Sequence, residues 1–295
     1  MYKEILKLLK CPKCNGELSL TVENEENSEI IDGKLRCNDG HDWAIRAGVI
    51  NFGSVEQEIA NNWTEVYEQY DEAEMDKKIA EDVPQNQVII GDKAKKFIID
   101  SINNKNSEFI LDIATGRGIL FKEMVKHVKT ESQIICTDLS FIVLKHDRLR
   151  TKKTNPEMKV NYIACDATNL PFKDNSIDTA VSFCGIANML NLAADGIKEA
   201  RRVLKVGQSL LDSYIILKED SKGVEKLKEF CKENNIGGAE EFTLKTGIEK
   251  AYIEAKFDSI SMTTIGESIG EKNEFDLVPF EGEWFAIVVV EGIKL

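Results

Sequence analysis

Residues 109–118 read FILDIATGRG, an apolar run that leads directly into a glycine-rich turn. The next segment, 119–128, has apolar side chains four residues apart at Leu120, Met124 and Val128, which is the spacing of one helix face. An apolar strand, a glycine turn and a helix are typical of a nucleotide-binding α/β sheet, because glycine lets the backbone approach a ligand closely. The stretch therefore predicts a cofactor site at this turn.

The glycine spacing narrows the choice of cofactor. A dinucleotide fingerprint would place glycine three residues after Gly118, but that position is Phe121, so the sequence disfavours NAD and FAD. Asp138 follows the next apolar run and can accept hydrogen bonds from both hydroxyls of a ribose. Asp166 follows the third apolar run and can accept one from an adenine amino group.

Strand-like and helical segments alternate through the rest of the chain, which predicts a mostly parallel sheet with helices on both faces. The expected strands are 109–113, 133–137, 160–164, 179–183, 209–217, 259–264 and 284–290. The expected helices among them are 119–128, 141–150, 193–204, 224–234 and 245–255.

Five segments in this order resemble the class I S-adenosylmethionine-dependent methyltransferases: 112–118, Asp138, Asp166-Ala167, 171–178 and 199–207. The resemblance implies a Rossmann-like α/β domain over residues 106–295, with about seven strands and an antiparallel last strand. It implies S-adenosylmethionine as cofactor, held by Asp112, Ala114, Thr115, Gly116, Gly118, Asp138, Leu139, Asp166, Ala167 and Phe183.

Two positions depart from the family pattern. Ala114 stands where the family usually has glycine, a change that costs little if the φ angle there is negative. Gly207 keeps one glycine of a turn that usually carries two. Among the cofactor candidates, Asp112 has an alternative reading as a helix cap.

The first 54 residues carry a second pattern, C-x2-C-x22-C-x3-H, formed by Cys11, Cys14, Cys37 and His41. Two such knuckles supply the four N and S ligands of a closed, structural Zn²⁺ site, and metal would stabilise a unit too small for its own core. The alternative is ordinary thiols and a surface histidine. Residues 8–53 resemble the zinc ribbon of the ribosomal RNA guanine-N1 methyltransferases and of related ribbon-fused methyltransferases.

Residues 55–105 are expected to form a helical lid or linker, with Tyr67 as a candidate contact to cofactor or substrate and Tyr70 in the core. The acceptor pocket should be lined by 183–188, by Ser213-Tyr214 and by this lid. Asn188 is its polar candidate, with a turn-capping role as the alternative. The sequence names no catalytic residue, because methyl transfer from a sulfonium chiefly needs alignment.

Charge and composition limit the partners. The chain has 38 Lys and Arg against 51 Asp and Glu, a net charge of −13, which argues against DNA and against wide electrostatic contact with RNA. A small-molecule acceptor is favoured, with ribosomal RNA and a non-catalytic binding role as alternatives. The sequence shows no bilayer-length apolar run and no signal peptide, so a cytoplasmic location without membrane contact is expected.

Overall fold

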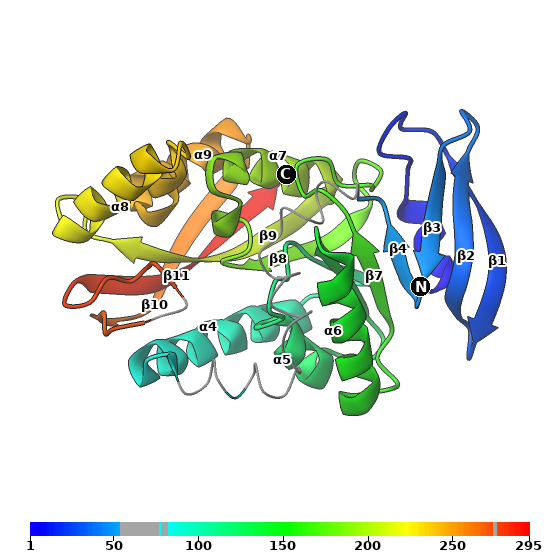
Figure 1. The fold of residues 1–295 in the computed structure, drawn as a ribbon, viewed down its shortest axis with the longest axis horizontal. Helices are drawn as coiled ribbons and strands as arrows, with labels where there is room; N and C mark the ends of the chain where they lie inside the picture. Colours follow the sequence, from blue (N-terminus) through cyan, green and yellow to red (C-terminus); the bar gives the residue numbers. More distant parts are fainter. Residues whose placement is uncertain (54–76, 78–81, 274–275) are drawn as a thin grey trace.

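The computed structural model describes residues 1–53, 77, 82–273 and 276–295. One sheet runs through these residues, with its 11 strands in the order β1-β2-β3-β4-β7-β6-β5-β8-β9-β11-β10 (Figure 1). No helix among the described residues has the length and apolarity that crossing a bilayer requires.

Seven of the strands form the predicted Rossmann-like sheet. They are β5 (Phe109–Asp112), β6 (Gln133–Asp138), β7 (Val160–Ala164), β8 (Ile177–Phe183), β9 (Leu204–Leu217), β10 (Ser259–Ile269) and β11 (Trp284–Lys294). The pairs β5–β6, β5–β8, β6–β7 and β8–β9 are parallel, whereas β11 is antiparallel to β9 and β10. The predicted α/β fold class and the antiparallel last strand are therefore confirmed.

Helices cover both faces of this sheet (Figure 1). One face packs against α4 (Gln85–Asn103), α5 (Phe121–His127) and α6 (Phe141–Thr154). The other packs against α7 (Ala193–Val203) and α9 (Lys245–Glu254). Every residue of β5, β6 and β7 is buried, which explains why these strands are mainly apolar and show no strict alternation of polar and apolar residues.

The remaining elements are α8 (Lys222–Glu233) and the short 3-10 helices η1 (Lys3–Leu8), η2 (Ala187–Leu192) and η3 (Ala239–Thr243). The last three strands are longer than expected. β9 begins at Leu204, five residues before the expected start, and passes through Gly207 at a φ of 83°. β10 and β11 pair with each other from Ser259 to Ile269, since cross-strand hydrogen bonding continues beyond the apolar runs.

The N-terminal unit, residues 1–53, is an antiparallel meander of β1 (Leu18–Glu26), β2 (Glu29–Cys37), β3 (Asp42–Arg46) and β4 (Val49–Asn51). Its last strand lies parallel to β7, with Val49, Ile50 and Asn51 opposite Tyr162, Ile163 and Ala164. The unit therefore extends the main sheet, and its apolar side chains belong to the same core.

About half of the helical lid expected over residues 55–105 lies outside the described residues, and so do Tyr67 and Tyr70. Within the described part, α4 begins after Pro84, as the helix break expected at this proline predicts. Of the apolar side expected for this helix, Ala94, Ile98 and Ile102 are buried, whereas Ile89 and Phe97 are exposed and Ile90 takes a place in the core instead.

A buried ion pair fastens the N-terminal unit to α6. Arg148 donates from Nε and Nη2 to the two carboxylate oxygens of Glu29, at 2.7 and 2.9 Å, and both side chains are largely buried. Arg36 and Asp42 make an ion pair of the same length, 2.7 Å, on the exposed surface of the unit. The two pairs thus offer a matched comparison of buried and exposed contacts.

We expect Arg148→Met to lower the free energy of unfolding by about 3 kcal/mol, because Glu29 would stay buried without its main partner. Arg36→Met should cost no more than about 1 kcal/mol. Urea denaturation of both variants tests this. Equal losses would show that the Arg148 pair does not fasten the two parts together.

Candidate cofactor site

The loop that follows β5 forms a tight turn at the carboxyl edge of the sheet. Three of its residues have positive φ angles: Ala114 at 53°, Gly116 at 53° and Gly118 at 66°. The backbone N–H of Thr115 donates to Thr137 O at 2.9 Å, and that of Gly116 donates to Asp138 Oδ2 at 2.8 Å. The loop is thus bonded directly to the end of β6.

Ala114 departs from the expectation of a negative φ angle. Its carbonyl is covered by Gly185, where a Cβ atom would overlap Ala114 O and lie 2.8 Å from Ile113 O. This close approach from the loop after β8 accompanies the left-handed conformation of Ala114, which costs an L-residue about 1–2 kcal/mol. The condition under which alanine would cost little here, a negative φ angle, is therefore not met.

Asp112 is only 1% exposed and lies beneath the loop. Burial, together with the nearby charges of Asp147 and Asp138, raises the pKa of Asp112 to about 8, against a hydrogen bond from Thr115 that lowers it. Helix α5 has Leu120 as its N-cap and no side-chain cap, so the reading of Asp112 as a helix cap is wrong. By contrast, Ala114, Thr115 and Gly116 are half-buried at the edge itself.

Asp138 links the first two loops of the edge. Its Oδ2 accepts from Gly116 N and its Oδ1 from Ser140 N at 2.9 Å, while the Ser140 hydroxyl caps α6 by accepting from Val143 N. A carboxylate has about four acceptor positions. Leu139, the next predicted contact, is half-buried beside it.

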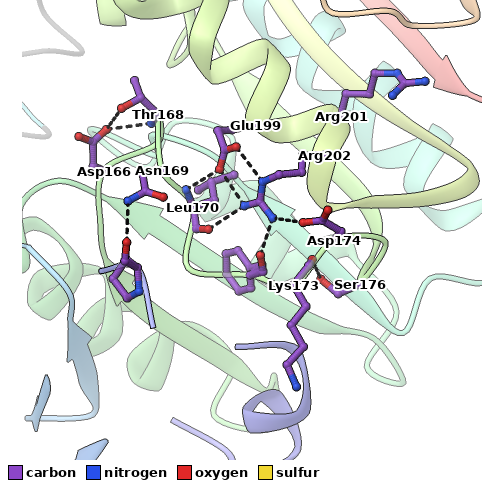
Figure 2. A network of polar contacts seen from close by, with 12 residues as sticks. Asp166, Thr168, Asn169, Leu170, Lys173, Asp174, Ser176, Glu199, Arg201 and Arg202 are labelled. Carbon is purple, nitrogen blue, oxygen red and sulfur yellow. Dashed lines mark hydrogen bonds and ion pairs between the residues drawn. The ribbon is translucent and has the colours of Figure 1, made fainter. Parts of the chain in front are cut away.

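The third loop, residues 165–176, joins β7 to β8 (Figure 2). Asp166 Oδ1 accepts from both the backbone N–H and the hydroxyl of Thr168, at 2.8 and 2.7 Å. Asp166 and its neighbour Ala167 are half-buried, as residues at a ligand-facing edge would be. The carboxylate is therefore held in one orientation by a local turn.

Arg202 and Glu199 of α7 hold this loop, a role that the sequence analysis missed. Arg202 donates to Leu170 O and Phe172 O at 2.8 and 2.7 Å and pairs with Asp174 at 2.7 Å (Figure 2). Asp174 is thus held within the loop by an ion pair. The contacts to Arg202 span about thirty residues, so no local pattern reveals them.

The fourth loop, after β8, contains the expected acceptor-lining residues. Phe183 is half-buried, and Ser182 Oγ accepts from Ile186 N at 3.0 Å, which fixes the turn around Gly185. Asn188 is exposed. On the adjacent strand Asp212 is completely buried, and burial raises its pKa to about 8. The sequence analysis missed Asp212, although an aspartate inside an apolar strand is a visible signal.

The four predicted metal ligands lie together in the N-terminal unit, where the turn of residues 11–14 meets the turn of residues 37–41. All their ligand atoms are within 4.8 Å of one another. Cys14 Sγ and Cys37 Sγ are 3.6 Å apart, and His41 Nδ1 lies 3.6 Å from Cys11 Sγ and 3.3 Å from Cys37 Sγ. The ligand atoms of a tetrahedral zinc are about 3.6–3.8 Å apart, so the cluster has the dimensions of a zinc site.

Comparison with known proteins identifies the family. The model of the ubiE/COQ5 methyltransferase family matches residues 53–222, more than half of the chain. The chain belongs to this family. The match covers β5 to β9 and the loops of the carboxyl edge, whereas the N-terminal unit up to Phe52 lies outside it.

Relatives of the ubiE/COQ5 family include a demethylmenaquinone methyltransferase of Porphyromonas gingivalis, 30% identical over 35% of this chain and 41% of the relative. A ubiquinone/menaquinone biosynthesis C-methyltransferase of Stenotrophomonas maltophilia is 30% identical over 38% of this chain and 44% of its own. The chain thus spans less than half the length of these relatives. A solved structure from Bacillus halodurans shares the fold, with 19% identity, a TM-score of 0.51, and 68% of this chain and 99% of that chain covered.

We expect Ala114→Gly to raise the free energy of unfolding by about 0.5–1 kcal/mol, because glycine relieves the positive φ angle at some cost in unfolded-chain entropy. Ala167→Gly is the matched control: Ala167 has no positive φ angle, so glycine there should lower stability. Chemical denaturation of both variants decides. Loss of stability in both would contradict the strained backbone at Ala114.

Proposed function

We propose that the protein is an S-adenosylmethionine-dependent methyltransferase whose cofactor lies across the carboxyl ends of β5, β6 and β7. The observation that carries the proposal is the hydrogen bond from Gly116 N to Asp138 Oδ2, which brings the glycine turn and the second-strand carboxylate into one site. Membership of the ubiE/COQ5 family supports it.

The donor groups at this edge suit the proposed cofactor. S-adenosylmethionine supplies a methyl group on a cationic sulfonium, and it carries no phosphate. Asp138 would hold the ribose, Asp166 the adenine, and the backbone of 114–116 the methionine part. Asp138 and Asp166 are acceptors for the hydroxyl and amino groups of a nucleoside.

A small molecule is the proposed acceptor, and a quinone-type ring carbon is the first class to test. The names of the relatives above support this choice, since they are quinone-pathway methyltransferases. An RNA acceptor has less support. Two of the few cations of the N-terminal unit, Lys34 and Arg36, both pair with Asp42, at 3.6 and 2.7 Å. Part of the unit's positive charge is thereby already neutralised.

We further propose that Cys11, Cys14, Cys37 and His41 hold a structural zinc ion. Their number, their chemistry and their mutual distances fit a closed tetrahedral site. Zinc would stabilise two turns, residues 11–14 and residues 37–41. Among the strand pairs of the described residues, the β1–β2 ladder is what links these two turns. Because thiolates must stay reduced to bind the metal, a cytoplasmic location is part of this proposal.

Cofactor binding is tested by isothermal titration with S-adenosylhomocysteine. We expect one site per chain, with at least about tenfold weaker binding in Asp138→Ala, which removes charge-assisted hydrogen bonds. Asp195→Ala is the control, because Asp195 pairs with Lys198 on an exposed part of α7. No binding to the wild-type protein, or tight binding of NADH instead, would overturn the proposed function.

The acceptor class is tested with methyl-labelled S-adenosylmethionine. We expect label to enter a reduced, hydroxylated naphthalene or benzene ring and not a ribosomal RNA hairpin. Transfer to the hairpin, with affinity that falls steeply as salt rises, would restore the RNA alternative.

Zinc is tested by elemental analysis of freshly purified protein. We expect about one equivalent per chain, lost in Cys14→Ser, because three ligands hold zinc far less tightly than four. Cys231→Ser is the control: this thiol is buried under α8, away from the cluster. Full zinc content in Cys14→Ser would exclude the proposed ligand set.

A further inference from the structure

The loop of residues 165–176, which carries Asp166, is held from two sides. One side is the N-terminal unit, which contacts it near the Cys11–Cys14 turn. The other side is α7, through Arg202 and Glu199 (Figure 2). Neither contact involves the proposed cofactor directly.

Four hydrogen bonds join the loop to the N-terminal unit, one of which is the exposed ion pair of Lys173 Nζ with Glu17 at 2.8 Å. Asn169 Nδ2 donates to Pro12 O at 3.1 Å, and Pro12 lies between the ligand candidates Cys11 and Cys14. The backbone N–H of Lys10 donates to Pro171 O at 3.0 Å, and that of Lys173 donates to Leu8 O at 2.8 Å. The loop therefore pairs with the chain that leads into the metal turn.

Apolar contacts reinforce these bonds. Leu170 and Phe172 of the loop are completely buried and share a core cluster with Leu9 and Cys11. Leu9 and Phe172 also form an antiparallel β-bridge. Removing order from the metal turn would thus disturb buried contacts of the loop as well as surface hydrogen bonds.

The start of the loop has a second link to the same unit. Asn51 of β4 pairs with Ala164, and Phe52 N donates to Ala164 O at 2.8 Å, one residue before the loop begins. Asn169 N donates to Asp166 O at 3.0 Å, which connects the Pro12 contact to the carboxylate residue within one turn.

We infer that the metal turn of the N-terminal unit positions the cofactor loop, with Asn169 as the positioning residue between Pro12 and Asp166. This inference rests on the proposed function, since it assigns a task to the same cofactor site. The N-terminal unit would then serve cofactor binding in this chain, in addition to any contact with the methyl acceptor.

The physical reason is pre-organisation. Four metal ligands fix the backbone of residues 11–14 and hence the acceptor Pro12 O. A loop already ordered in its binding conformation loses less entropy when the nucleoside binds, whereas a loose loop must be ordered at the expense of affinity. Arg202 alone would hold the loop from one side only.

The test combines two measurements on the zinc-loaded full chain, on chelator-treated protein and on Asn169→Ala. Hydrogen–deuterium exchange follows the peptide of residues 164–176, and titration gives the affinity for S-adenosylhomocysteine. The matched control is Asn103→Ala. The Asn103 amide also donates to a backbone carbonyl, that of His127 at 2.9 Å, but Asn103 ends α4 at the amino edge of β5.

We expect both zinc removal and Asn169→Ala to speed hydrogen–deuterium exchange over residues 164–176. Zinc removal should weaken S-adenosylhomocysteine binding about tenfold, and Asn169→Ala should weaken it about threefold while the variant retains its zinc. Asn103→Ala should change neither. Faster exchange confined to residues 1–53, with unchanged affinity, would overturn the inference and leave the proposed function standing. If the zinc-loaded wild-type protein does not bind S-adenosylhomocysteine at all, the proposed function fails. Exchange over residues 164–176 then still shows whether the metal turn orders the loop. Unchanged exchange there on zinc removal would overturn the inference as well.

Discussion

The structure depends on one short parallel pairing, that of Val49–Asn51 with Tyr162–Ala164. Through this pairing the N-terminal meander forms the edge of the main sheet instead of a separate domain joined by a linker. The pairing protects the β7 edge, which would otherwise present unpaired backbone groups. It also fixes where the cluster of three cysteines and His41 lies relative to the loop of residues 165–176, and the ion pair of Arg148 with Glu29 holds the same junction from the α6 side.

The carboxyl edge shows how a parallel sheet builds a site from distant segments. Each strand contributes the few residues after its end, and hydrogen bonds between neighbouring loops keep them in register. Gly116 with Asp138 joins the first two loops, and Cys165 N with Asp138 O joins the third at 2.9 Å. Gly185 completes the arrangement by lying against Ala114, where no larger residue would fit. The edge is therefore pre-formed by the chain itself.

Local patterns in the sequence predicted what depends on local interactions. Strand Val160–Ala164 was located to the residue, because four of its five side chains are apolar or aromatic, as a fully buried strand favours. The clustering of Cys11, Cys14, Cys37 and His41 followed from their spacing alone. The φ angle of Ala114 could not be predicted, since it goes with the close approach of Gly185, some seventy residues away.

Other features were missed for the same reason. The clamp of Arg202 on the 165–176 loop joins residues distant in sequence, and the three-residue strand β4 has too few residues to show a pattern. The starting point of β9 was misplaced because the segment from Leu204 to Gln208 is polar in part. Its two ends nevertheless pair with neighbouring strands, Leu204 with Ile177 of β8 and Gln208 with Lys294 of β11. Tertiary contacts set these features, so only the three-dimensional arrangement reveals them.

A crystal structure of the protein grown with S-adenosylhomocysteine, with anomalous data collected at the zinc edge, tests the cofactor site and the metal site most directly. We expect nucleoside density over the ends of β5, β6 and β7, its ribose at Asp138 and its adenine beside Asp166, and one anomalous peak among the three cysteines and His41. Nucleoside density elsewhere, or an empty carboxyl edge at saturating ligand, would contradict this expectation.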